Sequence, residues 1–398
     1  MKVLYLNNYD TSFIQNQIID LQKIGKIEAH FNIHLSYWVF FKYKKWDVKN
    51  VFSTTQHKSL TQQEKSLTLH CGLPKEFLME NEPFFIAKKL HRKFRKEKFD
   101  LIHAQNGFPS GMAAKLLSQK WGIPYIITSH GMDTNRCFTD SLEQANIRQF
   151  SPAVITKYRE ALMGADQVIG VSKAFAGLIK EVVPEANPIA IQNSYNSELF
   201  KLMDKDKVRK QLGISSQNLN LIFVGNLIKS KRHIDIVRAL KIIDKKSVKL
   251  VLIGSGEERV SVQNEIQKLD LASQVTLIPS LPQQDLANWY NASDIVIFPS
   301  LKDSFGLSLV EAMACGCPAI TTRTYGPIEI VQEAENGLFV DFKSPEQIAD
   351  KVNYFMANPH LINSIGKRAA ESVLQRYANK NQELLELYKR VIKEYEKE

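Results

Sequence analysis

Two carboxylates flank an aromatic-glycine turn in FPSLKDSFGLSLVEAMACGCPAI, which runs from Phe298 to Ile320. The apolar residues at its start predict a buried strand, and the helix-forming residues after Gly306 predict a helix. Free backbone amides and the positive end of the helix dipole favour an anionic ligand at that point. Asp303 and Glu311 are placed to accept hydrogen bonds from neutral hydroxyls around it. The stretch therefore predicts a site for phosphate plus sugar.

Short apolar runs typical of buried strands alternate with helical segments along the chain. This alternation is typical of a parallel sheet with helices on both faces. The first series comprises VLYLNN, DLIHAQ, PYIITSH, QVIGVS and IAIQNS. The second, after a polar segment, comprises LIFVGN, KLVLIGSG, QVTLIPS, DIVIFPS and PAITT. The predicted fold class is therefore α/β, with two doubly wound Rossmann-like domains.

The length of 398 residues also favours two domains, because one hydrophobic core usually stops growing at roughly 250 to 300 residues. We place the N-terminal domain at residues 1–198 and the C-terminal domain at 199–375, with a hinge near Asn196 to Lys205. The final segment, 376–398, is predicted to be a helix that packs back on the N-terminal domain. Its apolar residues at helical spacing are Leu384, Leu387, Tyr388, Val391 and Tyr395.

The composition is that of a folded, basic protein, with 44% hydrophobic and 24% charged residues. The net charge of +10 predicts an anionic partner, which could be nucleic acid, an anionic membrane or a phosphorylated substrate. No apolar run approaches the roughly 20 residues that span a bilayer, and MKVLYLNNYD is too short and weakly flanked for a signal peptide. We expect a cytoplasmic protein, with peripheral attachment at the inner face of the plasma membrane left open.

The four cysteines lack the paired spacing of a metal site; they are Cys71, Cys137, Cys315 and Cys317. Cys315 and Cys317 end an apolar helical segment with no second cysteine or histidine pair nearby. In a reducing compartment such thiols stay reduced. We therefore expect packing roles for these residues and no metal ion.

Several of these stretches together resemble a known family of enzymes. PSLKDSFGLSLVEAMACGCPAITT is similar to the motif of retaining glycosyltransferases of the GT-B fold, glycosyltransferase family 4, in which two glutamates flank a phenylalanine-glycine turn. HAQNGFPSGMAAKLLSQKWGIPYIITSHGMD, GVSKAF and VGNLIKSKRH extend the resemblance over most of the chain. The resemblance implies two Rossmann-like domains facing a central cleft, with the acceptor side in the N-terminal domain and the nucleotide-sugar site in the C-terminal domain.

The resemblance also implies roles for individual residues. The catalytic set would be His130, Asp303 and Lys231. The donor-binding set would be Asn226, Lys231, Phe305, Gly306, Leu307 and Glu311. Glu311 would bind the nucleotide ribose, Asp303 the sugar hydroxyls and Lys231 the diphosphate, while His130 would meet the donor sugar. No metal ion and no cofactor are implied, because lysine and helix-start amides would stabilise the leaving diphosphate.

Three positions depart from the family pattern. Asp303 stands where glutamate is usual and is one methylene shorter. Asn226 stands where the family has arginine, so Lys229 or Arg232 would have to supply the missing charge. The glycine pair that usually follows the first strand is absent from LNNYDTSFIQNQ. The residues that would face the phosphates there are Asn8, Tyr9, Asp10 and Thr11.

Each candidate also has a purely structural interpretation. Asp303 could cap the helix that follows it, because an aspartate before a helix accepts hydrogen bonds from its free amides. Lys231 could be a solvated residue at a helix start, although a cation is poorly placed there without an anion. His130 could be structural, but its position at the end of a strand, before Gly131, favours function. Asp133 is expected to orient the same loop.

The segment EPFFIAKKLHRKFRKEKFD, residues 82–100, places Ile86, Leu90 and Phe94 on one helical stripe. Its other faces are basic and carry Lys88, Lys89, Arg92, Lys93, Arg95 and Lys96. The helix is either a solvated surface helix or a docking face for an anionic membrane, where lipid-linked sugar acceptors reside. FFKYKKW nearby would extend such a face. Nucleic acid is disfavoured, because no recognised binding motif accompanies the charge.

The sequence thus predicts a retaining hexosyltransferase that moves a sugar from a nucleotide-diphosphate sugar, most simply a UDP-sugar, to a glycan or lipid-linked glycan acceptor in surface or exopolysaccharide synthesis. One alternative is a nucleotide-sugar-binding protein of the same fold with weak or no activity. Another is a GT-B-fold epimerase, which fold analogy alone does not exclude. A dehydrogenase is disfavoured, because IGSGEE, with Gly254 and Gly256, lacks the third glycine of a dinucleotide turn.

Overall fold

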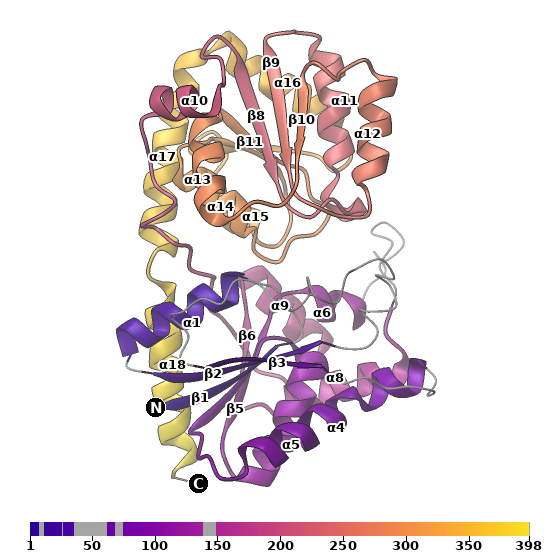
Figure 1. The fold of residues 1–398 in the computed structure, drawn as a ribbon, viewed down its shortest axis with the longest axis vertical. Helices are drawn as coiled ribbons and strands as arrows, with labels where there is room; N and C mark the ends of the chain where they lie inside the picture. Colours follow the sequence, from indigo (N-terminus) through magenta and orange to yellow (C-terminus); the bar gives the residue numbers. More distant parts are fainter. Residues whose placement is uncertain (8–11, 26, 36–61, 68–74, 138–148, 398) are drawn as a thin grey trace. The chain divides into compact units, whose positions relative to one another are not determined.

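The computed structural model describes residues 1–7, 12–25, 27–35, 62–67, 75–137 and 149–397. These residues form two compact units, each with its own sheet (Figure 1). Unit 1 contains the described residues up to Gln192 and those from Asn379 onward, and unit 2 contains Asn193–Ala378. The candidate phosphate-facing residues 8–11, the segment 40–46 and Cys71 lie outside the described residues.

Unit 1 is built on a parallel seven-stranded sheet in the order β3-β2-β1-β4-β5-β6-β7. The strands are β1 (Lys2–Asn7), β2 (Glu28–Leu35), β3 (Gln62–Leu67), β4 (Leu101–Ala104), β5 (Tyr125–Ser129), β6 (Gln167–Gly170) and β7 (Pro188–Ala190). Described residues of β1, β4 and β5 are almost all buried, as expected of central strands covered on both faces.

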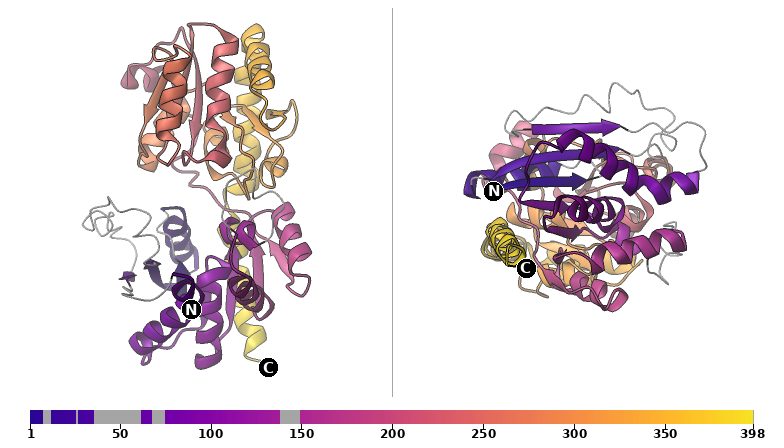
Figure 2. Two further views of the ribbon diagram at one scale, coloured as in Figure 1. Left: turned by 90° about the vertical axis from the view of Figure 1, so that its right-hand side faces the viewer. Right: turned by 90° about the horizontal axis from the view of Figure 1, so that it is seen from below.

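Helices cover both faces of this sheet (Figures 1 and 2). They are α1 (Ser12–Gly25), α4 (Lys75–Phe94), the π-helical turn η1 (Gly107–Gly111), α5 (Met112–Trp121), α6 (Met132–Cys137), α8 (Pro152–Met163), α9 (Lys173–Val182) and α18 (Lys380–Tyr395). The C-terminal helix α18 contacts α1. Its Leu384, Leu387, Tyr388 and Val391 join the core around β1, so the end of the chain packs on the unit that contains its beginning.

Unit 2 is built on a parallel six-stranded sheet in the order β10-β9-β8-β11-β12-β13. The strands are β8 (Leu219–Val224), β9 (Val248–Ile253), β10 (Val275–Ile278), β11 (Ile295–Phe298), β12 (Ala319–Thr322) and β13 (Gly337–Val340). The helices are α10 (Lys205–Leu212), the 3-10 turn η2 (Lys229–Lys231), α11 (His233–Ile243), α12 (Arg259–Lys268), α13 (Gln283–Ala292), α14 (Leu307–Ala314), α15 (Pro327–Ile330), α16 (Pro345–Ala357) and α17 (Pro359–Tyr377).

The strand order of unit 2 reverses direction between β8 and β11. These two strands pair in parallel, with Ile295 opposite Leu221 and Val296 opposite Ile222. In doubly wound sheets, ligands bind outside the carboxyl ends of the strands at such a switch point. The loops that follow β8 and β11 are therefore the expected site in this unit, and they contain the candidates Lys231 and Asp303.

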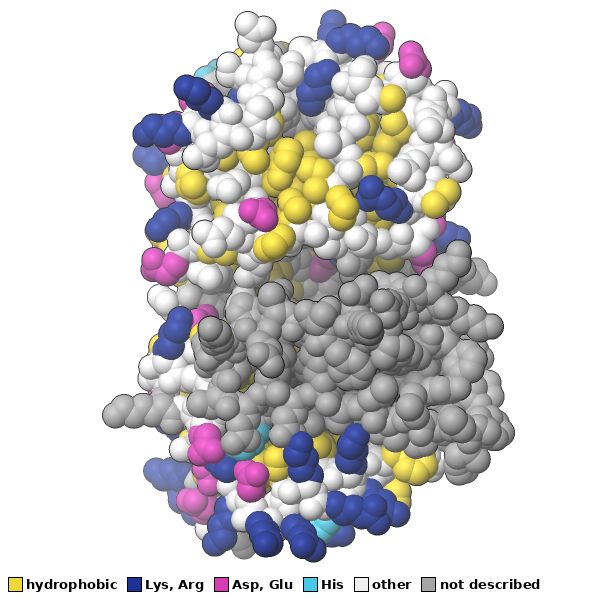
Figure 3. Space-filling view, in the orientation of Figure 1, with side chains coloured by type: hydrophobic (Ala, Val, Ile, Leu, Met, Phe, Trp, Pro, Cys, Tyr) yellow, Lys and Arg dark blue, Asp and Glu magenta, His cyan; other side chains and the backbone are white. Residues whose placement is uncertain are grey.

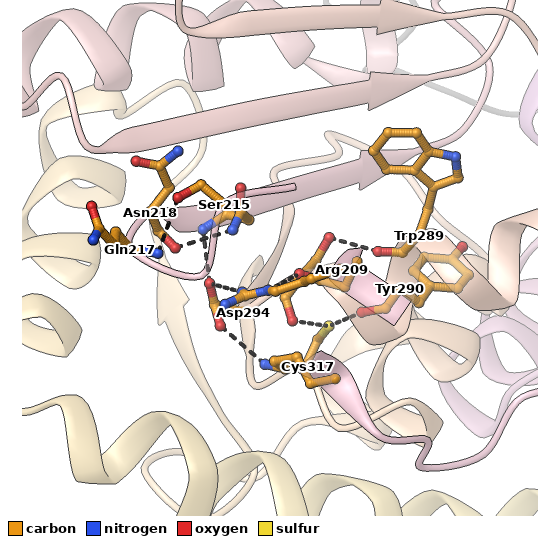
Figure 4. Close-up of polar contacts among 12 residues, drawn as sticks. Arg209, Ser215, Gln217, Asn218, Trp289, Tyr290, Asp294 and Cys317 are labelled. Atoms are coloured by element: carbon orange, nitrogen blue, oxygen red, sulfur yellow. Dashed lines mark hydrogen bonds and ion pairs between the residues drawn. The ribbon is translucent and has the colours of Figure 1, made fainter. Parts of the chain in front are cut away.

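A buried ion pair attaches α10 to the sheet at the amino end of β11 (Figure 4). The Arg209 guanidinium donates to Asp294 over 2.6 Å, and the Lys205 ammonium lies 3.0 Å from the same carboxylate. Asp294 also accepts from the backbone N–H of Asn220 on β8 over 2.8 Å. Because each charge has partners, this cluster is structural rather than a ligand site.

The prediction of two doubly wound α/β sheets is confirmed. The series of apolar runs did not include β2, β3 or β13. The sequence of β3, QQEKSL, is polar, and the strand occupies an edge position, where apolar residues are not required on both faces.

Candidate functional site

The loops after β8 and β11 are joined by a backbone hydrogen bond. The N–H of Leu301 donates to the carbonyl of Ser230 over 2.8 Å. This bond fixes η2, which carries Lys231, against the loop that carries Asp303. The parallel pairing of the two strands therefore brings together two residues that are distant in sequence.

Lys231 and Asp303 form a direct ion pair between the lysine Nζ and the aspartate Oδ2. Both side chains are mostly buried, with 20% of the lysine and 13% of the aspartate exposed. The Lys231 ammonium also lies 5.1 Å from the centroid of the Phe298 ring, within the range of a cation–π contact. The cation and the carboxylate are thus held in place by each other at the carboxyl end of the sheet.

Asp303 does not cap the following helix. The residue before α14 is Gly306, with φ of 93°, and no side chain accepts a hydrogen bond from the first amides of α14. The Asp303 Oδ1 instead accepts from the N–H of Phe305 over 3.3 Å, within the loop. The capping interpretation of Asp303 is therefore wrong, and the N-terminus of α14 is left without a side-chain cap.

The aromatic-glycine turn is fixed by close packing. Phe305 is buried and contacts Tyr377 edge-on at 5.5 Å between ring centroids. The backbone of Gly326 passes so close that a Cβ there would lie 1.9 Å from the Phe305 carbonyl oxygen. The Gly326 N–H donates to the Asp303 carbonyl over 3.1 Å. The turn that positions Gly306 and the start of α14 is consequently rigid, while Leu307 at the helix start is partly exposed.

Glu311 lies in α14 and is 6% exposed. The hydroxyl of Tyr290 on α13 donates to its Oε2 over 3.4 Å. Burial raises the pKa of the Glu311 carboxyl to about 8, so the group is mostly protonated at neutral pH. A ligand that supplied hydrogen-bond donors would favour the carboxylate form.

Three further polar groups near this loop have no hydrogen-bond partner among the described residues: Ser300 Oγ, Lys302 Nζ and Thr324 Oγ1. Ser300 is fully buried and Thr324 is 6% exposed. Burial lowers the pKa of Lys302 below its ordinary value. Buried polar groups without partners are costly, which makes them candidates for ligand contacts. Sequence reasoning missed all three; their position just after β11 and β12 was the available signal.

Arg232 does not supply the positive charge that is missing at Asn226, where the family has arginine. Its guanidinium donates two hydrogen bonds to the Asp235 carboxylate, of 2.8 Å and 2.6 Å. Asn226 and Lys229 are both exposed, so they remain available to a ligand.

His233, the first residue of α11, is buried, and neither of its ring nitrogens has a hydrogen-bond partner among the described residues.

In unit 1, His130 directly follows β5. Its Nε2 lies 2.9 Å from Oε1 of Gln105, which directly follows β4. Burial lowers the pKa of His130 to about 4, so the ring is neutral at physiological pH. Asp133, in α6, accepts hydrogen bonds from the N–H of Gly107 and from the hydroxyl of Ser129, the latter over 3.3 Å. It thereby connects the loops that follow β4 and β5.

The glycines of IGSGEE have a packing role. A Cβ at Gly254 would lie 1.9 Å from the Gly225 carbonyl oxygen, and one at Gly256 would lie 2.3 Å from that of Leu227. They let the loop after β9 contact the loop after β8, which explains the motif without a dinucleotide.

The described cysteines are buried free thiols; they are Cys137, Cys315 and Cys317. The Cys317 thiol lies 3.2 Å from the Tyr290 carbonyl oxygen (Figure 4). Across the parts of the chain that the structure describes, no group of three or more His, Cys, Asp or Glu side chains could hold a metal ion. In the same parts, no helix is both long and apolar enough to cross a bilayer.

The helix predicted for residues 82–100 is α4, which begins earlier, at Lys75, and ends at Phe94. Ile86, Leu90 and Phe94 are buried, as the stripe predicts. The exposed residues include Phe84, at 61%, and the basic side chains of Lys88, Lys89, Arg92 and Lys93. Basic side chains gather along the edge of unit 1 that is lowest in the space-filling view (Figure 3).

Two family profiles match adjoining parts of the chain. Glycosyl transferases group 1 matches residues 204–372, and Glycosyl transferase 4-like domain matches residues 69–193. Among curated relatives, N-acetyl-alpha-D-glucosaminyl L-malate synthase of Bacillus anthracis is 28% identical over 73% of this chain and 74% of its own length. D-inositol 3-phosphate glycosyltransferase of Pseudarthrobacter chlorophenolicus is 25% identical over 71% of this chain and 68% of its own length.

Solved structures share the fold over nearly the whole chain. Sucrose-phosphate synthase from Thermosynechococcus elongatus has a TM-score of 0.81 at 20% identity, over 98% of this chain and 99% of that one. Anabaena HepE, solved in complex with UDP-glucose, has a TM-score of 0.76 at 19% identity, over 98% of this chain and all of the other. These likenesses concern the fold, and they match the expected pair of Rossmann-like domains.

Proposed function

Because the chain belongs to the group 1 glycosyltransferases of the GT-B fold, family 4, we propose that it is a retaining hexosyltransferase that uses a UDP-sugar donor. The observation that carries the proposal is the Lys231–Asp303 ion pair beside the uncapped N-terminus of α14. A cation, a carboxylate and free helix amides at one strand end match the diphosphate and the hydroxyls of such a donor.

The ion pair suggests how a donor would engage unit 2. A diphosphate that reaches the N-terminus of α14 would compete with Asp303 for the Lys231 ammonium. Lysine binds phosphate as a point charge without a demanding geometry, so it can change partner by a small rotation of its side chain. Asp303, relieved of the lysine, would then accept hydrogen bonds from the sugar hydroxyls. The pair would keep both groups in place until the donor arrives.

Glu311 is proposed to bind the ribose. Its carboxyl is buried on α14 with the Tyr290 hydroxyl as neighbour, and a ribose diol would supply two donors to the ionised form. The raised pKa, about 8, means that the free protein holds this group mostly protonated at neutral pH. Ribose binding would therefore release a proton from Glu311.

The transfer step is proposed to proceed on the face of the sugar that the diphosphate leaves. The bond between the anomeric carbon and the phosphate oxygen breaks, and its electron pair leaves with the diphosphate. The acceptor oxygen bonds to the same carbon, and its proton passes to the leaving phosphate oxygen. Lys231 and the helix amides would stabilise the charge that develops, and His130 is proposed to contact the donor sugar.

This mechanism uses no metal ion, so EDTA is expected to leave the transfer rate unchanged. A loss of transfer on chelation that magnesium restores would overturn the metal-free step.

Two observations suggest different classes of acceptor. The family resemblance suggests a hydroxyl of a surface or exopolysaccharide precursor, free or lipid-linked. The names of two relatives instead specify small acidic or phosphorylated acceptors, L-malate and D-inositol 3-phosphate, and the net charge of +10 suits such anions equally. Incubating the protein with a panel of UDP- and GDP-sugars and both acceptor classes, followed by mass spectrometry, separates these possibilities.

The same panel tests the two alternatives. A nucleotide-sugar-binding protein without activity would bind a donor but would neither transfer nor slowly hydrolyse it. An epimerase would convert one nucleotide sugar into its epimer without an acceptor. Transfer to an acceptor hydroxyl, with release of the nucleoside diphosphate, is the result expected of the proposed function.

We also propose that α4 docks on an anionic membrane surface. An exposed Phe84 next to Lys88, Lys89 and Arg92 combines an apolar anchor with a basic face. Each basic residue near an anionic surface contributes about 1 kcal/mol. Docking would bring the protein to a lipid-linked acceptor.

A further inference from the structure

Gln105 directly follows β4, and its side chain contacts His130, which directly follows β5. The pairing of β4 with β5 runs to Ala104 opposite Ile127, so the residues beyond it lie at the same edge of the sheet. Gln105 is 2% exposed, and its Oε1 is 2.9 Å from Nε2 of His130. Its backbone N–H donates to the Leu6 carbonyl over 2.9 Å. The backbone of Gln105 is therefore fixed to β1, and one side of its buried side-chain amide faces His130.

The other side of the amide faces His103, a fully buried residue of β4. Gln105 Nε2 lies 3.3 Å from Nδ1 and 3.4 Å from Nε2 of that ring. Nδ1 of His103 is 2.6 Å from the Tyr388 hydroxyl, and Nε2 is 2.8 Å from the Thr128 hydroxyl. Tyr388 also accepts from the Tyr5 hydroxyl over 3.2 Å. The amide thus continues a network that joins β1, β4, β5 and α18.

Burial keeps the titratable members of this network neutral. It lowers the pKa of His103 to about 3, with His130 as a second cause, and lowers the pKa of His130 to about 4. It raises the pKa of Tyr5 and of Tyr388 above their usual values. A neutral imidazole has one donor nitrogen and one acceptor nitrogen. The partner of one nitrogen therefore decides what the other can do.

We propose that Gln105 is a positioning residue that holds His130 as the tautomer protonated on Nε2. The amide oxygen can only accept, so Nε2 of His130 must donate to it. The amide nitrogen lies against the face of the His103 ring, where an N–H is favoured over an oxygen, and this opposes a flip that would present a donor to His130. Nδ1 of His130 is then an acceptor, suited to a hydroxyl of the donor sugar. This inference rests on the proposed role of His130, and it makes α18, through Tyr388, part of the support.

The tautomer is measurable without any donor, by two-bond ¹H–¹⁵N correlation NMR of the histidine rings in the full-length protein. The His130→Gln variant assigns the His130 signals by their disappearance. The expected pattern is a protonated Nε2 and a bare Nδ1. A ring protonated on Nδ1 would overturn the proposal.

Two substitutions of Gln105 sharpen the measurement. Gln105→Met keeps an unbranched side chain of similar length and removes the acceptor, so the single-tautomer pattern of His130 should be lost. Gln105→Glu places a carboxylate at the same distance and should raise the pKa of His130 by about 1 to 3 units. Tyr5→Phe is the matched control, because it removes a buried hydroxyl of the same network that does not touch Gln105. An unchanged His130 in Gln105→Met, with a folded protein, would contradict the proposal.

Activity separates this inference from the proposed function. If both hold, Gln105→Met should lower kcat by up to about 100-fold, as expected for a displaced catalytic group, with a smaller change in KM for the donor. The tautomer can change as expected while Gln105→Met transfers sugar at the wild-type rate. That result would support the proposal that Gln105 positions His130 and would contradict the proposed role of His130 in the reaction.

Discussion

The candidate residues of the two units are held by different kinds of interaction. In unit 1, His130 is hydrogen-bonded to Gln105, which belongs to a hydrogen-bond network that runs from β1 to α18. In unit 2, Lys231 and Asp303 have each other as charged partners, and Lys302 has no hydrogen-bond partner among the described residues. Unit 1 orients a neutral ring before any ligand binds, whereas unit 2 holds charges that a ligand can take over. The comparison predicts that substitutions in unit 2 act first on donor binding and charge, and that those around His130 act on geometry.

The largest effect is expected at Lys231, on the charged side of this comparison. Lys231→Ala should lower turnover by about 100-fold, because it removes the cation that stabilises the leaving diphosphate. Lys231→Arg should lose less, because the charge is kept. Steady-state kinetics with the best donor of the panel measures both. Lys241→Ala removes an exposed lysine of α11 that has no proposed role in the site and serves as the control; equal losses in the Lys241 and Lys231 variants would mean that Lys231 has no special role.

Glu311 is expected to give the next largest effect. Glu311→Gln should weaken nucleotide binding by about 1.5 to 3 kcal/mol, because an amide offers one acceptor where a carboxylate accepts from two ribose hydroxyls. Calorimetry with free UDP measures the change. Glu346→Gln, an exposed change on α16, is the matched control. Unchanged affinity in a folded Glu311 variant would exclude the ribose role.

The pH dependence of binding supplies a second readout at Glu311. Its pKa is about 8 in the free protein, and the ribose hydroxyls should lower that pKa in the complex. Affinity should therefore rise as the pH rises toward 8 and level off above it, with a proton released at pH 7. Calorimetry in buffers of different ionisation enthalpy detects that proton. The rise should be absent in Glu311→Gln, and its persistence there would assign it to another group.

Asp303 separates sugar contacts from nucleotide contacts within unit 2. Asp303→Ala should leave the affinity for UDP unchanged or higher, because the carboxylate that competes for Lys231 is gone, and should reduce transfer by roughly 10- to 100-fold, the equivalent of one charge-assisted hydrogen bond. Comparing UDP binding with transfer kinetics in one variant gives the result. Similar losses in both assays would mean that Asp303 acts mainly by holding Lys231.

The smallest effect per residue is expected on α4, which lies outside both sites. Changing Lys88, Lys89, Arg92 and Lys93 to glutamate should release the protein from anionic vesicles, with about 1 kcal/mol from each lost charge, and should leave transfer to soluble acceptors intact. The control reverses Lys241, Lys245, Lys246 and Lys268, which are exposed in unit 2 and give the same change in net charge. Vesicle sedimentation at low salt measures binding. Wild-type protein that stays in solution, or sediments equally with neutral vesicles, would leave α4 as a solvated face.

Sequence reasoning reached the fold because the apolar runs and the helices between them show their periods locally. It identified the loop of Asp303 and Glu311 for the same reason, since a strand, a glycine turn and a helix follow each other within that stretch. The contact between Lys231 and Asp303 was out of reach, because it depends on β8 pairing with β11, which are separated by β9 and β10 in sequence. Gln105 was missed because an amide after a strand carries no chemical signal until its partners His130 and His103 are known.

The proposed retaining transfer from a UDP-sugar is tested most directly by the anomeric configuration of the product. The protein is incubated with the UDP-α-sugar and acceptor that the panel selects, and the product is analysed by proton NMR at the anomeric position before any chemical equilibration. A retaining transfer gives an α-linked product together with UDP. A β-linked product would contradict retention, and binding of the donor without transfer to any acceptor would contradict the transferase activity itself.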